Sequence, residues 1–327
     1  MSNVTYPKLF VVGCPRSGTS WVTSLIAGHP EVVAVPVETH AYRLIYEPFL
    51  TLPDQPLAHR LRSWKGILRR YGPKPLLLGF APADIWRGIL RDYDILNHPH
   101  SHGLHGLANT ADFRVLVAAA QKNSKLASVQ AEDLIQLLLD RFFQQQNCPG
   151  LTLLEKTPLH IRYVDRILQR FPDAKVVEVI RDGRDVCASY NALATTQPWA
   201  NIGTAGAIRQ WRRCIDWGER YRAQSDLSPR IHAVRYEDLK SDTAASLKHL
   251  FDFANLSWND AQISHIVRAT DINSIRRRGK GQYVRKGAVG DWKQSLSPED
   301  ISLCQEIAGD RLADLGYSET RIPVQSI

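Results

Sequence analysis

The segment best suited to phosphate chemistry is a short glycine-containing loop at residues 13–18. It follows the apolar run 9–12, which is typical of a buried strand, and precedes a helical pattern that starts near residue 19. Backbone N–H groups in such a loop can converge on an anion, and the N-terminus of the following helix adds a favourable dipole. Arg16 places a cation inside the loop. These residue types and their spacing predict a site for one phosphate group with a cation beside it.

The loop departs from the nucleoside triphosphate pattern GxxxxGK[ST] at one position. Gly13 and Gly18 have the required spacing, but Thr19 stands where that pattern has its lysine. A kinase without the lysine that reaches the terminal phosphates is disfavoured. A small-molecule kinase on the same fold nevertheless stays an alternative.

Two further segments carry residue types that bind anions. The run 175–180 predicts a buried strand with Arg181 at its carboxyl end, and Ser189 lies eight residues later in the next helical pattern. Arginine offers two parallel donors and serine a hydroxyl, so this pair could grip a second phosphate. The RKG run at 285–287 joins two cations to a glycine that permits close backbone approach to an anion. The basic cluster 276–280 is typical of a solvated loop, and a non-catalytic binder of anions or nucleic acid is the second alternative.

The elements that must position these side chains alternate between strands and helices. Short apolar runs predict strands at 9–12, 151–154, 175–180 and 231–235, with a fifth candidate at 32–35. Amphipathic patterns predict helices at 21–27, 132–145, 160–171, 185–193 and 205–223. This alternation predicts an α/β fold with a central parallel sheet flanked by helices, and with ligands at the carboxyl ends of the strands.

Residues 50–125 interrupt this alternation. They hold six prolines with short helical patterns between them. We interpret them as a mainly helical lid inserted into a single domain of residues 1–327.

Composition limits the class of protein without naming a ligand. Of 327 residues, 44% are apolar and 23% charged, which excludes a disordered or fibrous chain. Lys and Arg number 41 against 33 Asp and Glu, a net charge of +8 that suits nucleic acid, an acidic membrane surface or a small anion alike. The five cysteines form no CxxC pair, which is evidence against a disulfide framework or a zinc finger. With no signal-peptide pattern and no apolar run of about 18 residues, we expect a cytoplasmic protein without a transmembrane segment.

Three ordered motifs resemble the signatures of one family. PRSGTSW at 15–21, VIRDGRDVCAS at 179–189 and RKGAVGDWKQSLS at 285–297 look like those of the sulfotransferases. That family uses 3′-phosphoadenosine 5′-phosphosulfate (PAPS) as donor and releases 3′-phosphoadenosine 5′-phosphate (PAP). The resemblance implies a P-loop-like α/β fold and in-line transfer of a sulfuryl group, without a metal, to a hydroxyl of a small-molecule, carbohydrate or lipid acceptor.

The same resemblance assigns a donor site. Its members would be Pro15, Arg16, Ser17, Gly18, Thr19, Ser20, Trp21, Arg181, Ser189, Tyr236, Arg285, Lys286 and Gly287. Arg16 would neutralise charge that develops on the bridging oxygen as the S–O bond breaks. Trp21 would stack on the adenine and Tyr236 would contact the nucleotide.

The acceptor side needs a cation near the sulfuryl group and a base for the hydroxyl proton. Lys156, at the end of a predicted strand, matches a family lysine that contacts the sulfuryl group. The cytosolic small-molecule branch has a histidine two residues after this lysine, and here Pro158 takes its place. Glu38 resembles the glutamate of protein-tyrosine sulfotransferases and is the first candidate base. His160 and a lid residue such as His40 stay open as alternatives.

A histidine-rich stretch, HPHSHGLH at 98–105, lies in the predicted lid. Its alternating spacing has no supporting Cys or Asp set, so it does not predict a metal site. We expect it to form part of the lid or of the acceptor site.

Overall fold

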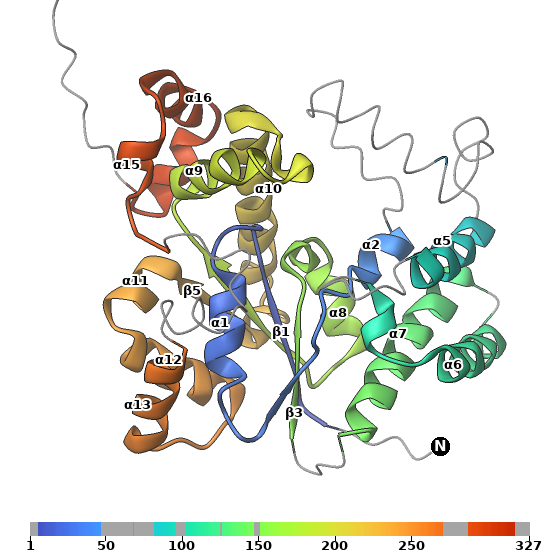
Figure 1. Ribbon diagram of the computed structural model, residues 1–327. Coiled ribbons are helices and arrows are strands. Elements are labelled where there is room, and N and C mark those ends of the chain that lie inside the picture. Colours follow the sequence, from blue (N-terminus) through green and yellow to red (C-terminus); the bar gives the residue numbers. More distant parts are fainter. Residues whose placement is uncertain are drawn as a thin grey trace, which may run out of the picture.

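The computed structural model describes residues 6–46, 68, 82–95, 103–124, 126–146, 151–270 and 287–317. The chain is built around a five-stranded parallel sheet of order β2-β3-β1-β4-β5 (Figure 1). The strands are β1 (Lys8–Gly13), β2 (Val32–Ala34), β3 (Thr152–Lys156), β4 (Lys175–Ile180) and β5 (Ile231–Arg235). All five predicted strands are present, with ends shifted by at most two residues.

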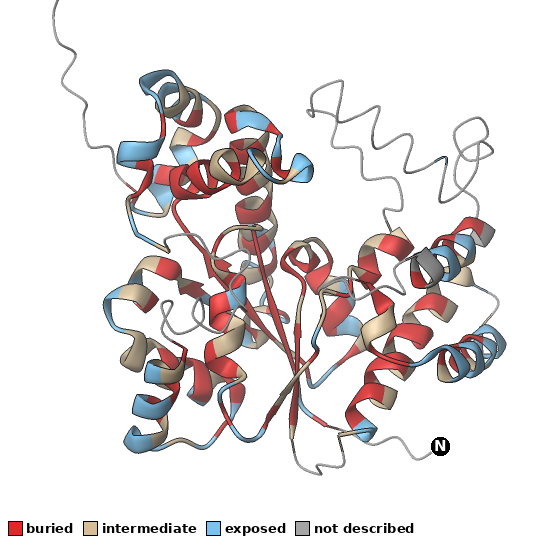
Figure 2. Cartoon of the chain, in the orientation of Figure 1, coloured by how far each residue is buried: buried red, intermediate tan, exposed pale blue. Residues whose placement is uncertain are grey.

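Side chains alternate between the two faces of each strand and therefore pack in two separate hydrophobic cores. In β1, Leu9 and Val11 pack in one cluster, whereas Phe10 and Val12 pack in the other. Because both faces are covered, the central strands are apolar almost throughout, and Figure 2 shows them buried along their length.

Four helices cover the first face. They are α1 (Thr19–Ile26), α11 (Tyr236–Ser241), α12 (Thr243–Ala254) and α13 (Asp260–Ala269), grouped together in Figure 1. Val22 and Leu25 of α1 are fully buried and pack in one cluster with Leu247 and Phe251 of α12. This packing fixes the direction of α1, whose N-terminus ends the phosphate loop.

The second face carries α8 (Val164–Arg170), α9 (Gly183–Ala194), α10 (Gly203–Arg222) and α16 (Pro298–Asp314). The short elements there are η2 (Pro158–Tyr163), η3 (Pro198–Ala200), η4 (Ser228–Arg230) and α15 (Trp292–Ser295). The prediction of one helix over 160–171 was wrong at its start. A 3₁₀ helix begins at Pro158. Tyr163, with φ −128° and ψ 23°, interrupts the helical conformation before α8.

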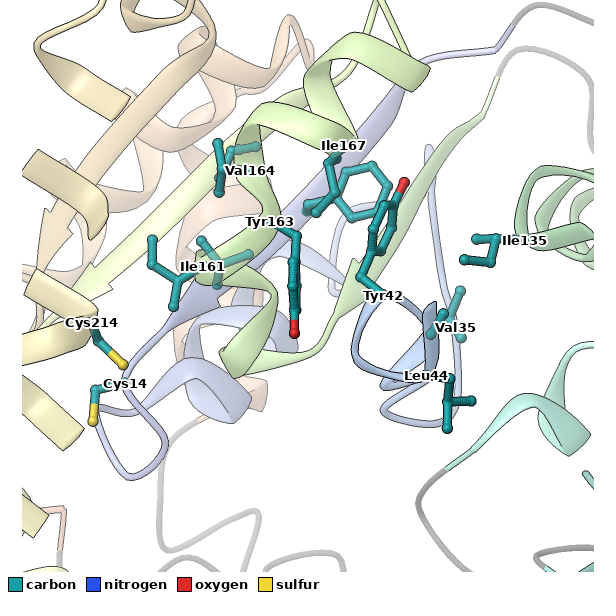
Figure 3. Packing of buried hydrophobic residues seen from close by; sticks show 14 of the residues in the cluster. Cys14, Val35, Tyr42, Leu44, Ile135, Ile161, Tyr163, Val164, Ile167 and Cys214 are labelled. Atoms are coloured by element: carbon teal, nitrogen blue, oxygen red, sulfur yellow. The ribbon is translucent and has the colours of Figure 1, made fainter. Parts of the chain in front are cut away.

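The remaining helices form a group at the β2 side of the sheet. They are α2 (Ala41–Tyr46), α5 (Pro82–Ile95), η1 (Leu104–Gly106), α6 (Thr110–Asn123) and α7 (Ala127–Gln144). Figure 3 shows Tyr42 of α2 beside Tyr163, and it draws Val35 and Ile135 of α7 as members of the same core cluster. Within 50–125, the described segments are therefore mainly helical, and α5 and α6 pack against α7.

The described cysteines, Cys14, Cys187, Cys214 and Cys304, are buried and free. None of the described helices has the length and apolarity needed to cross a bilayer.

Candidate active site

The phosphate loop turns sharply between β1 and α1. Gly13 has φ +144°, and a Cβ there would lie 2.5 Å from the carbonyl oxygen of Val179 in β4. Gly18 has φ +94°, and a Cβ there would lie 2.4 Å from the Tyr236 ring. Both positions need glycine on conformational and steric grounds. Tyr236, predicted to contact the nucleotide, thus packs directly on the loop.

Two buried polar atoms beside this loop have no hydrogen-bond partner in the described part of the chain. They are Oγ of Ser17, a residue 1% exposed, and Nε of Arg181. Buried donors are nearly always satisfied in folded proteins, so each needs an explanation. An anion bound in the loop would supply the acceptors, and the loop therefore fits a phosphate or phosphosulfate group.

Arg16 stands inside the loop with the left-handed φ of +77°. Its Nε donates to Oγ of Ser189, a residue of α9, over 3.1 Å. Ser189 therefore pairs with Arg16, whereas the sequence had suggested that it would act beside Arg181. The hydrogen bond points Arg16 into the cavity described below.

Arg181 joins the three sequence motifs. Its Nη1 donates to the carbonyl of Arg16 over 3.3 Å, and its Nη2 to the carbonyl of Ala288 over 2.8 Å. The guanidinium also lies 3.4 Å from the Asp185 carboxylate and 4.5 Å from the centre of the Tyr236 ring. This residue holds the C-terminal segment against the phosphate loop.

The C-terminal segment is fastened at several further points. Tyr236 donates its hydroxyl to the carbonyl of Gly287 over 2.9 Å. Asp185 accepts from the backbone N–H groups of Gly290 and Trp292, each over 2.9 Å. Gly287 thus contacts Tyr236, which packs on the loop, while Arg285 and Lys286 lie outside the described residues. The role of these three residues at the 3′-phosphate stays a prediction.

Trp21 is buried beneath a lysine. Its indole N–H donates to the carbonyl of Thr270 over 3.2 Å, and its ring meets Tyr236 edge-on at 5.5 Å. Nζ of Lys240 lies 4.9 Å above the same ring. Stacking of adenine on that face would require Lys240 to move.

A carboxylate and an ammonium face each other at the carboxyl end of β3. Lys156 donates to Oε1 of Glu38 in a short ion pair and to Oγ of Ser20 over 3.3 Å. Ser20 belongs to the first turn of α1, so Lys156 connects Glu38 to the phosphate loop. His40 Nε2 lies 3.5 Å from the other Glu38 oxygen.

The electrostatics keep Glu38 ionised. Burial alone would raise the pKa of Glu38, but the His40 hydrogen bond and the Lys156 ammonium outweigh it and lower the pKa to about 2. Burial lowers the pKa of His40, with Arg43 adding to the effect, although Glu38 opposes it. His40 is therefore a neutral partner near pH 7.

A second carboxylate, Glu155, lies beneath this pair and is 2% exposed. Its Oε1 accepts from the hydroxyls of Thr39 and Thr157, and its Oε2 contacts Nδ1 of His160 at 3.2 Å. His160 is itself 2% exposed and does not line the cavity. Of the two main base candidates, Glu38 faces the cavity and His160 is bound to Glu155 below it.

A cavity of about 820 Å³ brings these groups together. Its charged lining consists of Arg16, Glu38, Arg43 and Lys156, joined by His40. Its apolar lining is Val35, Pro36, Val37, Pro158, Leu159, Trp199 and Ile202. Trp199 is 47% exposed and meets Tyr190 edge-on at 6.3 Å, with Tyr190 held by Gln210 over 2.9 Å. One wall is thus the phosphate loop and another is apolar, as a donor and an acceptor side would require.

Residues 7–260 of this chain match the sulfotransferase family model. The chain belongs to the sulfotransferase family. The match covers the phosphate loop, Glu38, Lys156 and the Arg181 region, whereas the segment that starts at Gly287 lies beyond it.

Two curated sulfotransferases illustrate the distance of the relationship. Protein-tyrosine sulfotransferase 1 of Danio rerio is 24% identical over 177 residues, which cover 52% of this chain and 49% of the relative. Sulfotransferase 6B1 of Danio rerio is 26% identical over 156 residues, 42% of this chain and 52% of the relative. The chain spans about half the length of these relatives.

Solved sulfotransferases share the fold. The structure of mouse sulfotransferase SULT7A1 complexed with PAP superposes with a TM-score of 0.51 at 14% identity, covering 95% of this chain and 86% of that one. The sulfotransferase domain from the curacin biosynthetic pathway gives a TM-score of 0.51 at 18% identity, covering 94% and 98%. The predicted P-loop-like α/β fold with a central parallel sheet is confirmed.

Several residues of this sulfotransferase site went unrecognised in the sequence. Thr39, Thr157 and Glu155 flank the charged residues that were singled out, and that adjacency was the available signal. Trp199 gave none, because a lone tryptophan before a helix is ordinary.

No group of three or more His, Cys, Asp or Glu in the described ranges is arranged to hold a metal ion. Of the histidine-rich stretch, His105 belongs to η1, whereas His98, His100 and His102 lie outside those ranges.

Proposed function

We propose that this protein transfers the sulfuryl group of PAPS to an acceptor hydroxyl by in-line displacement. The observation that carries the proposal is the bridge from Glu38 through Lys156 to Ser20 of the phosphate loop, on the same cavity as Arg16. This bridge supports a single continuous site in which the residues proposed to bind the donor lie next to the proposed base.

The donor supplies an activated sulfuryl group next to the bridging oxygen of its 5′-phosphosulfate. Residues 15–20 and the orphaned Ser17 hydroxyl would hold that group, and Arg181 with the 287–290 segment would hold the 3′-phosphate. The cation of Arg16 is placed to neutralise charge on the bridging oxygen when the S–O bond breaks.

Glu38 is proposed as the base that takes the acceptor's hydroxyl proton. A carboxylate whose pKa is near 2 is a weak base. We propose that Lys156 turns from Glu38 to the sulfuryl oxygens when donor binds, which would remove the principal cation beside Glu38. Its pKa would then rise toward the ordinary value, and its basicity would rise with it. The acceptor oxygen forms the new bond to sulfur as the bridging oxygen leaves with the electron pair, and the proton passes to Glu38.

The acceptor is proposed to be a hydroxyl compound, whether small molecule, carbohydrate or lipid, with an apolar or ring-bearing body next to the hydroxyl. Support comes from the apolar lining and the half-exposed face of Trp199 at the cavity.

Sulfur-35-labelled PAPS, incubated with a panel of hydroxyl compounds, tests the proposal. We expect label to move to at least one panel member in the presence of EDTA. Arg16→Ala and Glu38→Gln should each lower kcat by roughly 10²–10⁴-fold. Arg230→Ala is the matched control, since Arg230 holds carbonyls of the α8–β4 turn, and it should retain activity.

A Glu38→Gln variant with more than about a tenth of the wild-type kcat would show that Glu38 is not the base. His160→Ala then becomes the next variant to assay. Transfer of phosphate from ATP to the panel, in place of sulfuryl transfer, would favour the kinase alternative.

A further inference from the structure

The pair formed by Glu38 and Lys156 rests on a buried hydrogen-bond network. Glu155 accepts from Thr39 Oγ1 over 2.9 Å and from Thr157 Oγ1 over 2.6 Å. Thr157 Oγ1 also accepts from the backbone N–H of Thr39 over 3.0 Å. Thr39 and Thr157 have 3% and 0% exposure, so neither touches solvent or the cavity.

The two threonines of this network are next to the ion pair in sequence. Thr39 directly follows Glu38, and Thr157 directly follows Lys156. Two segments that are 118 residues apart in sequence, the stretch after β2 and the end of β3, are therefore held together one residue away from the ion pair. The Thr157 hydroxyl is the centre of the network because it donates to Glu155 and accepts from Thr39 at once.

Glu155 gives the network a fixed charge. Burial raises the pKa of Glu155, but His160 and the two threonine hydroxyls outweigh it and lower the pKa below its ordinary value. The His160 ring is held edge-on by Tyr42 at 5.3 Å, and its Nε2 has no hydrogen-bond partner among the described residues. An ionised carboxylate with three buried donors is a rigid anchor, since loss of any donor leaves charge unsatisfied.

We infer that Thr157, together with Thr39 and Glu155, positions the Glu38 carboxylate against Lys156 and toward the acceptor. These are positioning residues, because they act through Glu38 and touch neither donor nor acceptor. The inference rests on the proposed role of Glu38 as base. A displacement of about 1 Å at a reacting group can cost on the order of 10²-fold in rate, so a network of this kind matters for turnover.

A graded series of threonine variants tests it in the full chain. Thr157→Val keeps the shape but removes both the donor to Glu155 and the acceptor for Thr39. We expect kcat to fall about 10–100-fold with the affinity for PAP unchanged. Thr39→Val removes one hydroxyl and leaves the backbone bond to Thr157, so its loss should be smaller. Thr157→Ser restores the hydroxyl and should recover most of the wild-type kcat.

Thr204→Val is the matched control. Thr204 is also buried, and its hydroxyl accepts from Asn191 over 2.9 Å, away from the Glu38 segment. It should lose stability to a similar degree while keeping kcat. An equal fall of kcat in Thr204→Val and Thr157→Val would mean that any buried threonine loss has this effect, and would overturn the inference.

A readout independent of turnover separates this inference from the proposed function. In protein with ¹³C-labelled glutamate, the Glu38 carboxyl signal is identified by its absence in Glu38→Gln. We expect the pKa of Glu38 to rise by about 1 in Thr157→Val, because the contact with Lys156 loosens, and to stay unchanged in Thr204→Val. A pKa of Glu38 that is the same in Thr157→Val and wild type would refute the positioning role. If the wild-type protein transferred no sulfuryl group, the proposed function would be wrong. The titration of Glu38 would still show whether Thr157 positions the Glu38 carboxylate.

Discussion

At the scale of single residues, the chemistry of this site depends on one carboxylate and its two nitrogen partners. Glu38 lies between the ammonium of Lys156 and the imidazole of His40, with about one fifth of its side chain exposed. These contacts keep Glu38 ionised and also stabilise the folded protein, because the unfolded chain lacks them.

The stability of the protein should therefore depend on pH through Glu38. Its pKa is lowered from 4.5 to about 2 in the fold, so its contribution is fully present above about pH 4.5 and is lost as pH falls toward 2. Between pH 6 and pH 3 the stabilising contribution should shrink by about 2 kcal/mol.

Guanidinium unfolding of wild type and Glu38→Gln at both pH values measures this loss. The gap in unfolding free energy between the two proteins should be wide at pH 6 and narrower at pH 3. A gap that stayed constant, or widened on acidification, would contradict the ion pair.

The identity of Lys156 and Glu38 as candidates came from the sequence, but the buried network beneath them did not. Glu155 follows three apolar positions of a strand, where a carboxylate suggests no partner until the fold supplies one. Thr39 and Thr157 are 118 residues apart in sequence, so their contact is set by the β2–β3 pairing and not by any local pattern.

At the scale of elements, the phosphate loop depends on how closely β1 approaches β4. A Cβ at Gly13 would lie 2.5 Å from a backbone carbonyl, and that neighbour cannot rotate away. Gly13→Ala should thus combine a strained φ with a clash, lose about 2–4 kcal/mol of stability and weaken PAP binding more than tenfold.

Gly316→Ala serves as the control for the backbone conformation alone. Gly316 has φ +72°, but its nearest neighbour would be a side-chain nitrogen 3.9 Å away. It should cost only about 1 kcal/mol and leave PAP affinity unchanged. Calorimetric titration with PAP and thermal unfolding check both variants; similar losses of stability would argue against the steric role of β4.

The strands could be predicted from sequence because the central ones are buried on both faces and therefore consist mostly of apolar residues. Helices were harder to predict where tertiary packing overrides the hydrophobic pattern of the sequence. The 3₁₀ turn from Pro158 and the non-helical Tyr163 replace the start of the predicted 160–171 helix. The helices α11, α12 and α13 were not among those predicted. The described parts of 50–125 are helical, while their role as a lid stays a prediction.

At the scale of the whole molecule, Arg181 brings together three segments that are distant in sequence and that we propose to form the donor site. Its guanidinium contacts the carbonyls of Arg16 and Ala288, which lie near opposite ends of the sequence. The net charge of +8 agrees with a donor that carries several negative charges. The roles of Arg285 and Lys286, and a cytoplasmic location, stay predictions.

Calorimetric titration of the purified protein with PAP and, separately, with ATP tests the central claim most directly. PAP carries the 3′-phosphate that the Arg181 region should hold, and Thr19 leaves no lysine for the terminal phosphate of ATP. We predict that PAP binds at least tenfold more tightly than ATP without added metal, and that it raises the melting temperature by mass action. Equal affinity for the two nucleotides, or tighter binding of ATP, would contradict the account.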